Sequence, residues 1–280
     1  MKLRISNLIL EITRRCNMCC DHCLRGDDQG LNMNIFTIRN LLCKIKDISS
    51  ITFTGGEPSL AVNALYDIRE YCEHRQIPVN SGFLATNGKR ISDAFLNECD
   101  AWHLYCLSNI FACTDKQNIR GKEIEKLTRM ILRDNDWEYG MCVALSVDQF
   151  HDEIPVENVL RLTSKSYFSK SKFNYDHFEA VINGATKYSG IQRSGRAKEF
   201  LSDFAREHEP EIDTDWTLNE DIKEPILYVE TLYVNAKGDI LFDCDLSYDD
   251  QETYKIGNVN DETWTDTLYA YLKQRKEEDQ

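Results

Sequence analysis

Short apolar runs alternate along the chain with longer stretches in which apolar residues recur every three or four positions. The runs predict strands, and the longer stretches predict amphipathic helices. The expected strands cover residues 8–12, 51–54, 78–86, 141–147 and 178–182. The expected helices cover residues 36–48, 63–75 and 156–167. This repeat of strand, loop and helix indicates an α/β fold with a parallel sheet and helices outside it.

The C-terminal part of the chain changes to a strand–turn–strand pattern. Alternating segments flank residues 236–239, which have the composition of a hairpin turn, and a last helix is expected from Trp264. We therefore expect two units. Residues 1–200 form the α/β unit, and residues 201–280 form an acidic linker followed by a β-hairpin and helix cap.

Charge and apolar runs narrow the class of protein. The net charge of −14 disfavours a general nucleic-acid binder, which needs a basic surface. The first residues contain a short apolar run that is interrupted by Glu11, so they do not resemble a signal peptide. No stretch approaches the roughly 18 apolar residues of a membrane span. We expect a cytoplasmic protein that does not bind membranes.

The cysteines of one short segment carry the candidate chemistry. Cys16, Cys20 and Cys23 are separated by three and two residues in a chain of 11 cysteines. Three thiolates in one loop can bind three irons of a four-iron cluster and leave the fourth iron open. Cys19 adjoins Cys20 and is interpreted as a bystander. A zinc site that combines Cys16, Cys23 and His22 with Cys19 or Cys20 is the main alternative.

Two motifs together resemble the signature of the radical S-adenosylmethionine (radical SAM) superfamily. One is the cysteine motif after the first expected strand, and the other follows the second strand and reads Gly55-Gly56-Glu57-Pro58. The resemblance implies a partial (β/α)6 TIM-like barrel, a 4Fe-4S cluster and S-adenosyl-L-methionine. It also implies reductive cleavage of this cofactor to a 5′-deoxyadenosyl radical that abstracts hydrogen from a substrate. Gly55, Gly56 and Glu57 would hold the methionine amino group.

Further positions match the family more loosely. The resemblance implies a role in cofactor binding for Thr86, Asn87, Ser146 and Arg196, and also for Pro58 at the exit of the glycine loop. The candidates for proton or hydrogen transfer are Asp148, His151 and Cys244. The last of these lies in a segment that resembles a degenerate SPASM/twitch extension without its auxiliary-cluster cysteines, which predicts a single cluster.

The fourth barrel strand has two possible positions. Residues 91–135 have a largely helical pattern, although residues 102–107 could form a strand that would place Ser108 in the cofactor position. Alternatively, a helical insertion precedes the strand at 141–147. We favour the insertion, because the residues from Ser146 to His151 match the family pattern better.

These observations favour a radical SAM enzyme that acts on a peptide or amino-acid side chain, as in ribosomal peptide maturation. Two alternatives stay open. The substrate could be a small metabolite such as a nucleotide or sugar, or the chain could be a zinc or iron–sulfur binding protein without catalysis. An enzyme of this kind would receive its electron from a flavodoxin- or ferredoxin-type donor.

Overall fold

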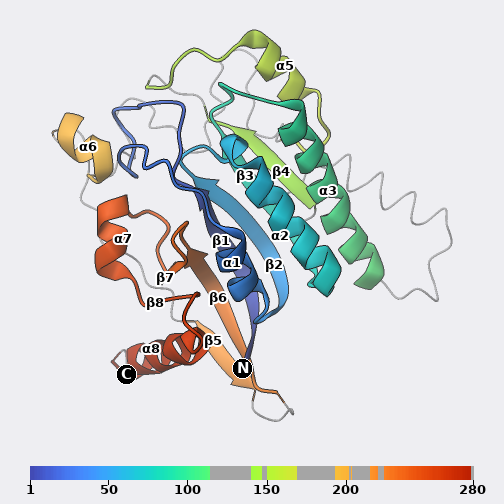
Figure 1. Ribbon diagram of the computed structural model, residues 1–280, viewed down its shortest axis with the longest axis vertical. Coiled ribbons are helices and arrows are strands. Elements are labelled where there is room, and N and C mark those ends of the chain that lie inside the picture. The colour runs from blue at the N-terminus through green and yellow to red at the C-terminus, as the bar shows by residue number, and fades with distance from the viewer. Residues whose placement is uncertain are drawn as a thin grey trace.

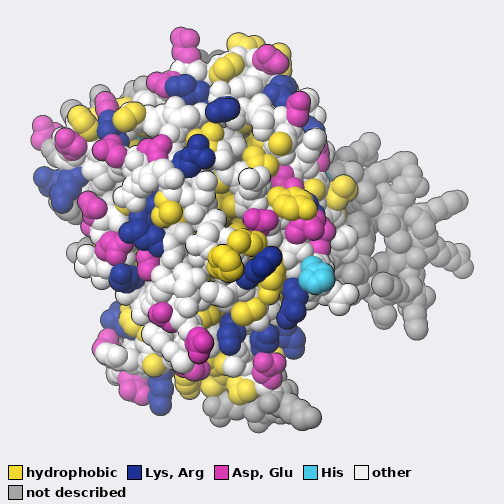
Figure 2. All heavy atoms as spheres, in the orientation of Figure 1, with side chains coloured by type: hydrophobic (Ala, Val, Ile, Leu, Met, Phe, Trp, Pro, Cys, Tyr) yellow, Lys and Arg dark blue, Asp and Glu magenta, His cyan; other side chains and the backbone are white. Residues whose placement is uncertain are grey.

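The computed structural model describes residues 1–113, 140–146, 150–168, 193–201, 203, 215–219 and 224–278. The candidate Asp148, the expected strand at 178–182 and much of the acidic linker lie outside these ranges. None of the helices within them has both the length and the apolar character needed to cross a bilayer. Acidic and basic side chains are interspersed over the face of the molecule seen in Figure 2.

Strands and helices alternate through the first part of the chain, as the apolar pattern predicts. These elements are β1 (Lys2–Thr13), α1 (Ile35–Leu42), β2 (Ile45–Gly55), α2 (Val62–Arg75), β3 (Val79–Thr86), α3 (Asp93–Cys113), β4 (Gly140–Leu145) and α5 (Val156–Thr163). A short 3₁₀ turn at Pro58–Leu60 precedes α2.

The later elements are shorter. They are α6 (Gly195–Phe200), β5 (Trp216–Asn219), β6 (Ile226–Val234), β7 (Asp239–Leu241), α7 (Tyr248–Tyr254), β8 (Gly257–Asn258) and α8 (Trp264–Glu278). The expected hairpin is confirmed, since β6 and β7 pair antiparallel across the turn. The sequence pattern did not predict α7.

One sheet with the order β4-β3-β2-β1-β6-β7-β8 runs through the molecule. Neighbouring strands from β4 to β6 are parallel, whereas β5, β7 and β8 pair antiparallel. The helices α1, α2 and α3 lie against one face of the parallel part (Figure 1). The predicted α/β class with a mostly parallel sheet is confirmed. The strand β6, which begins the expected cap, pairs in parallel with β1 on the side opposite β2.

Alternate apolar residues build the face of the sheet that the helices cover. Phe53 of β2 packs against Trp102 of α3 with ring centroids 5.0 Å apart. Leu10 of β1 and Leu84 of β3 lie beside Phe53 in the ladder and belong to the same buried core. Because side chains alternate along a strand, the residues between these positions point to the other face of the sheet.

The expected end of the first helix was wrong, and the structure also decides between the two positions considered for the fourth strand. The helix expected at 36–48 ends at Leu42, and β2 begins three residues later at Ile45. Ile45 has helical spacing from Ile38 and Leu41, but it pairs with Leu3 of β1 and is buried there, so sheet packing overrides the local pattern. The alternative strand at 102–107 lies inside α3. The strand beside β3 is β4, which agrees with the favoured helical insertion.

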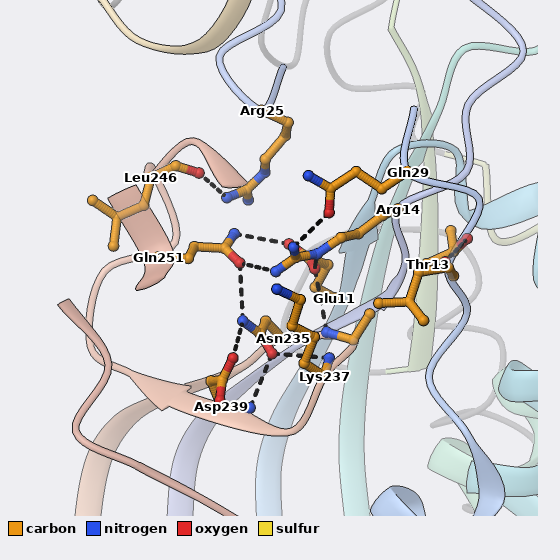
Figure 3. Close-up of polar contacts among 12 residues, drawn as sticks. Glu11, Thr13, Arg14, Arg25, Gln29, Asn235, Lys237, Asp239, Leu246 and Gln251 are labelled. Atoms are coloured by element: carbon orange, nitrogen blue, oxygen red, sulfur yellow. Dashed lines mark hydrogen bonds and ion pairs between the residues drawn. The ribbon is translucent and has the colours of Figure 1, made fainter. Parts of the chain in front are cut away.

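A buried ion pair occupies the end of β1. The Arg14 guanidinium donates to the Glu11 carboxylate over 2.7 Å, and both side chains are completely inaccessible to solvent. Gln251 of α7 bridges the pair, accepting from Arg14 Nη2 at 2.6 Å and donating to Glu11 Oε2 at 2.9 Å (Figure 3). The Tyr233 hydroxyl of β6 also donates to Glu11 over 2.7 Å. The charges are therefore neutralised and hydrogen-bonded by residues from three parts of the chain.

This ion pair predicts a large loss of stability when one charge is removed. Glu11→Ala leaves a buried guanidinium without its counter-charge, which costs about 3–5 kcal/mol of unfolding free energy. As a matched control, Asp47→Ala removes the partner of Arg4 from a half-exposed pair at 2.8 Å and should cost at most about 1 kcal/mol. Urea unfolding of both variants provides the test. Equal, small losses would contradict the assignment of the Glu11–Arg14 pair as a structural anchor.

Candidate functional site

A cavity of about 460 Å³ lies at the carboxyl ends of the parallel strands. The cysteine loop, defined as residues 14–30 after β1, forms one wall. The predicted site residues that line the cavity are Cys16, Cys20, Cys23, Gly55, Gly56, Glu57, Pro58, Thr86, Asn87, Ser146, His151 and Cys244. The fold thus brings together segments that are far apart in the sequence, at the end of the sheet where α/β proteins place their sites.

The three cysteines of the motif face this cavity, and their neighbour does not. Cys16, Cys20 and Cys23 are partly buried and line the cavity, whereas Cys19 is exposed and is not among the lining residues. A turn in which the Cys23 N–H donates to the Cys20 carbonyl over 3.1 Å keeps these two residues close in space. This arrangement supports the interpretation of Cys19 as a bystander.

The donor set of the cysteine loop suits a cluster. Within the described ranges, no three His, Cys, Asp or Glu side chains converge closely enough to bind one metal ion. A four-iron cluster attaches each thiolate to a different iron, so its ligands need not converge on a single point. Three thiols around one cavity therefore fit a cluster bound through three irons. Burial raises the pKa of Cys16 to about 11, so binding of a metal there must displace a proton.

Gly55 and Gly56 allow the end of β2 to approach the start of the cysteine loop. A Cβ atom on Gly55 would lie 2.0 Å from the Thr13 carbonyl oxygen, and one on Gly56 would lie 2.4 Å from that of Arg15. The Gly56 N–H donates to the Thr13 carbonyl over 2.9 Å, and the Glu57 N–H donates to the Arg15 carbonyl over 2.8 Å. The glycines are thus required by contacts between two backbone segments, a reason that the motif alone does not reveal.

The Glu57 carboxylate joins the ends of two strands. It is almost fully buried and accepts from the Thr86 hydroxyl at 2.6 Å and the Asn87 N–H at 2.8 Å. It also accepts from the Ser59 N–H at 3.0 Å, which caps the following 3₁₀ turn. A carboxylate has about four acceptor positions, so it can accept one further hydrogen bond from a bound group.

Asn87 ties the end of β3 to the cysteine loop. Its side-chain amide donates to the Asn17 side chain over 2.9 Å, while its carbonyl accepts from the Lys89 N–H at 3.0 Å. Ser146 is held at the same level, because its N–H donates to the Thr86 carbonyl over 2.8 Å. These contacts align three of the loops around the cavity.

Arg196 lies outside the set of cavity-lining residues. Its guanidinium donates to the Cys20 carbonyl over 3.2 Å and to Asp27 over 2.8 Å, and its N–H donates to the Cys23 carbonyl over 2.9 Å. Gly195 before it has a φ of +51°, and a Cβ there would lie 2.3 Å from the Leu24 carbonyl. Arg196 therefore links α6 to the cysteine loop, and its guanidinium is hydrogen-bonded to protein groups.

Two histidines lie close together in the wall of the site. The rings of His22 and His151 are 5.3 Å apart edge to face, and His22 also lies 4.8 Å from the ring of Phe150. Both histidines line the cavity. Cys244 enters the cavity from the segment after β7 and is adjacent to Asp245, whose carboxylate lies 3.6 Å from its sulfur. His151 and Cys244 thus face the same cavity.

Other groups at this site were not predicted from the sequence. The remaining lining residues include Ile9, Thr52, Thr54, Phe83 and Ala85, which alternate along β1, β2 and β3. Arg25 of the cysteine loop is buried and donates to the Leu246 carbonyl over 2.7 Å. The sequence gives one indication of the buried polar network beneath the cysteine loop. This is Glu11, a charged residue within an apolar strand.

Comparisons with known proteins add few constraints. No family model matches the chain. A protein of Methanocaldococcus jannaschii described as Uncharacterized protein MJ0907 is 30% identical over 93 residues, which are 32% of this chain and 32% of that protein. The chain therefore matches about a third of the length of this relative.

Two solved structures show a weak overall likeness. The structure described as native anSMEcpe with bound AdoMet and Cp18Cys peptide has a TM-score of 0.42 at 14% identity and covers 95% of this chain and 80% of that chain. The structure of Streptococcus suis SuiB bound to precursor peptide SuiA has a TM-score of 0.33 at 13% identity. The match covers 85% of this chain and 59% of that chain. Likeness at this level does not establish a shared activity, so the function is inferred from the residues of this chain.

The state of the Cys244 thiol provides a prediction from this geometry. Burial, and then Asp245, raises its pKa to about 11 from 9.0, which keeps the thiol protonated at neutral pH. Alkylation requires the thiolate. We expect alkylation of Cys244 in the folded protein to accelerate about tenfold per pH unit from pH 8 towards pH 11. Mass spectrometry of the Cys244 peptide measures this rate, and a rate already constant between pH 8 and pH 10 would contradict the buried, neutral thiol.

Proposed function

We propose that the protein is a radical SAM enzyme with a single 4Fe-4S cluster, in which Cys16, Cys20 and Cys23 are the ligands. The observation that carries this proposal is the shared cavity. The three cysteines and the Gly55–Pro58 segment face the same space at the carboxyl ends of the strands. Three thiolates leave one iron without a protein ligand, which is the position that a small chelating group can occupy.

The strand ends around the cavity fit the methionine part of S-adenosyl-L-methionine. The N–H groups of Gly56 and Glu57 bond to the backbone of β1 and the cysteine loop, so the groups left to receive an ammonium are carbonyls and the Glu57 carboxylate. Thr86, Asn87 and Ser146 surround the remaining space. When bound, the cluster and S-adenosyl-L-methionine supply a 5′-deoxyadenosyl radical that removes a hydrogen atom from the substrate.

The residues of the chain then orient the substrate and protect the reaction. His151 and Cys244 lie on the cavity wall, where they can contact a substrate, and we assign them to proton or hydrogen transfer together with Asp148. Cys244 remains a neutral thiol at physiological pH, since its pKa is raised to about 11 by burial. A neutral thiol retains the hydrogen atom that a thiolate lacks, as hydrogen donation by Cys244 requires.

We assign the substrate to the peptide class because the C-terminal segment resembles the extension of peptide-modifying members of the superfamily. This segment contributes Cys244 and Asp245 to the cavity, so it borders the reacting group. A small metabolite is the second candidate. The one-electron reduction that the reaction needs would come from a flavodoxin- or ferredoxin-type protein in a reducing, cytoplasmic environment.

Anaerobic reconstitution with iron and sulfide tests the proposal. We expect one four-iron cluster per chain and, after reduction with S-adenosyl-L-methionine, formation of 5′-deoxyadenosine. Cys20→Ala should abolish both the cluster spectrum and the product. Cys19→Ala is the matched control because it removes the neighbouring exposed thiol, and it should retain both.

Three results would contradict the proposal. The first is a protein that binds only zinc and does not cleave the cofactor. The second is a Cys19→Ala variant that loses the cluster as completely as Cys20→Ala does. The third is a reconstituted cluster that never yields 5′-deoxyadenosine, which would favour a non-catalytic iron–sulfur protein.

The hydrogen bonds from Arg196 to the cysteine loop lead to a separate prediction. Arg196→Ala removes donors to the Cys20 carbonyl and to Asp27, so the loop should hold the cluster less firmly. We expect the iron bound after reconstitution and desalting to fall at least about twofold, with faster loss of the cluster to a chelator. Lys198→Ala on the same helix is the control. Unchanged retention in Arg196→Ala would show that Arg196 does not position the loop.

A further inference from the structure

The face of β2 opposite the helices carries a line of hydroxyl groups. Phe53 points to the helix α3, as its contact with Trp102 shows, so Thr52 and Thr54 point to the other face of the sheet. Ser50 lies two residues earlier and shares that face. These three residues, called here the hydroxyl ladder, are each partly exposed.

The hydroxyl ladder has unused hydrogen-bonding capacity. Among the described residues, no side-chain hydrogen bond involves Ser50, Thr52 or Thr54, and none involves the side chain of Asn7, which pairs with Ser50 across β1 and β2. Ser81, the neighbour of Ser50 on β3, differs because its hydroxyl donates to the Ser49 carbonyl over 3.3 Å. Half-buried polar groups without protein partners require water or a ligand.

The strand neighbours of Ser50 and Thr52 on β1 and β3 are uncharged. Thr52 pairs with Ile9 of β1 on one side and with Phe83 of β3 on the other. The charged residue beside Thr54 is Glu11, which is fully buried and paired with Arg14. A ligand beside Ser50 and Thr52 therefore meets hydroxyls, one amide and apolar side chains, which suits the uncharged main chain of a peptide. The charged residues of the same cavity, Glu57, Arg25 and Asp245, lie on the loops around it.

We propose that the hydroxyl ladder and Asn7 bind the main chain of an extended peptide that runs along β2 towards the cavity; this inference rests on the radical SAM function proposed above. Successive hydroxyls of the ladder are about 6.6 Å apart, the length of two residues in an extended chain. In an extended peptide the main-chain groups that point to one side repeat at the same distance. Alternate hydroxyls can therefore meet alternate amides, and Ile9 and Phe83 can contact the side chains between them.

The ladder also leads to the reacting centre. Thr52 and Thr54 line the cavity, and Thr54 directly precedes Gly55. A peptide anchored at Asn7 and Ser50 would extend along β2 and place a residue near His151 and Cys244. Main-chain recognition at the ladder leaves the choice of the modified residue to the cavity itself.

Binding of a defined peptide to the reconstituted protein tests this inference. The probe is an acetylated and amidated octapeptide of alternating glycine and serine, observed by saturation-transfer NMR. A second probe replaces the glycines with sarcosine, which removes alternate amide N–H groups. We expect the first probe to bind, the sarcosine probe to bind about tenfold more weakly, and the double variant Asn7→Leu with Ser50→Ala to weaken the first probe by about tenfold, the loss expected from two ordinary hydrogen bonds.

Ser49→Ala is the matched control, because Ser49 is the neighbour of Ser50 on the same strand and points to the opposite face. It should bind the peptide like the unmodified protein. Three outcomes would overturn the inference: no transfer to the peptide, equal binding by the double variant, or binding of maltoheptaose in place of the peptide. Formation of 5′-deoxyadenosine by the unmodified protein, measured on the same samples, shows separately whether the proposed radical function holds.

Discussion

The ion pair between Glu11 and Arg14 lies where β1 ends and the cysteine loop begins, and much of the site depends on it. Two charges cannot remain in this solvent-free position unless each is paired and hydrogen-bonded. Gln251 and Tyr233 supply those bonds from α7 and β6. The C-terminal segments therefore complete the environment of β1, and the direction in which the chain leaves β1 is coupled to them.

This coupling extends to the loops around the cavity. Several polar residues at positions typical of cofactor ligands form hydrogen bonds to neighbouring loops. Glu57 bonds to Thr86 and Asn87, and Arg196 bonds to the Cys20 carbonyl. Such residues hold the cysteine loop and the strand ends in fixed positions. The groups that remain for a ligand are backbone carbonyls, thiols, small hydroxyls and one further acceptor position of the Glu57 carboxylate, which together form a pre-organised site.

The sequence predicted the repeated part of the fold well, because apolar runs and glycine-containing turns depend on local geometry. The parallel order of the strands and the meeting of the cysteine loop with Gly55–Pro58 follow from that repeat. The predicted end of α1 was wrong because Ile45 fits both a helix and a buried strand. Only the pairing of Ile45 with β1 decides between them. The reason for Gly55 and Gly56 could not be read from the motif either, since the clash with the backbone of Thr13 and Arg15 is a long-range contact.

In the proposed enzyme, three cysteines hold a cluster whose fourth iron is open to S-adenosyl-L-methionine. Mössbauer spectroscopy of the protein reconstituted with iron-57 tests it most directly. Addition of S-adenosyl-L-methionine should change the signal of one iron in four and leave the other three unchanged. Four irons that stay equivalent after this addition, or iron that never assembles into a four-iron cluster, would contradict it.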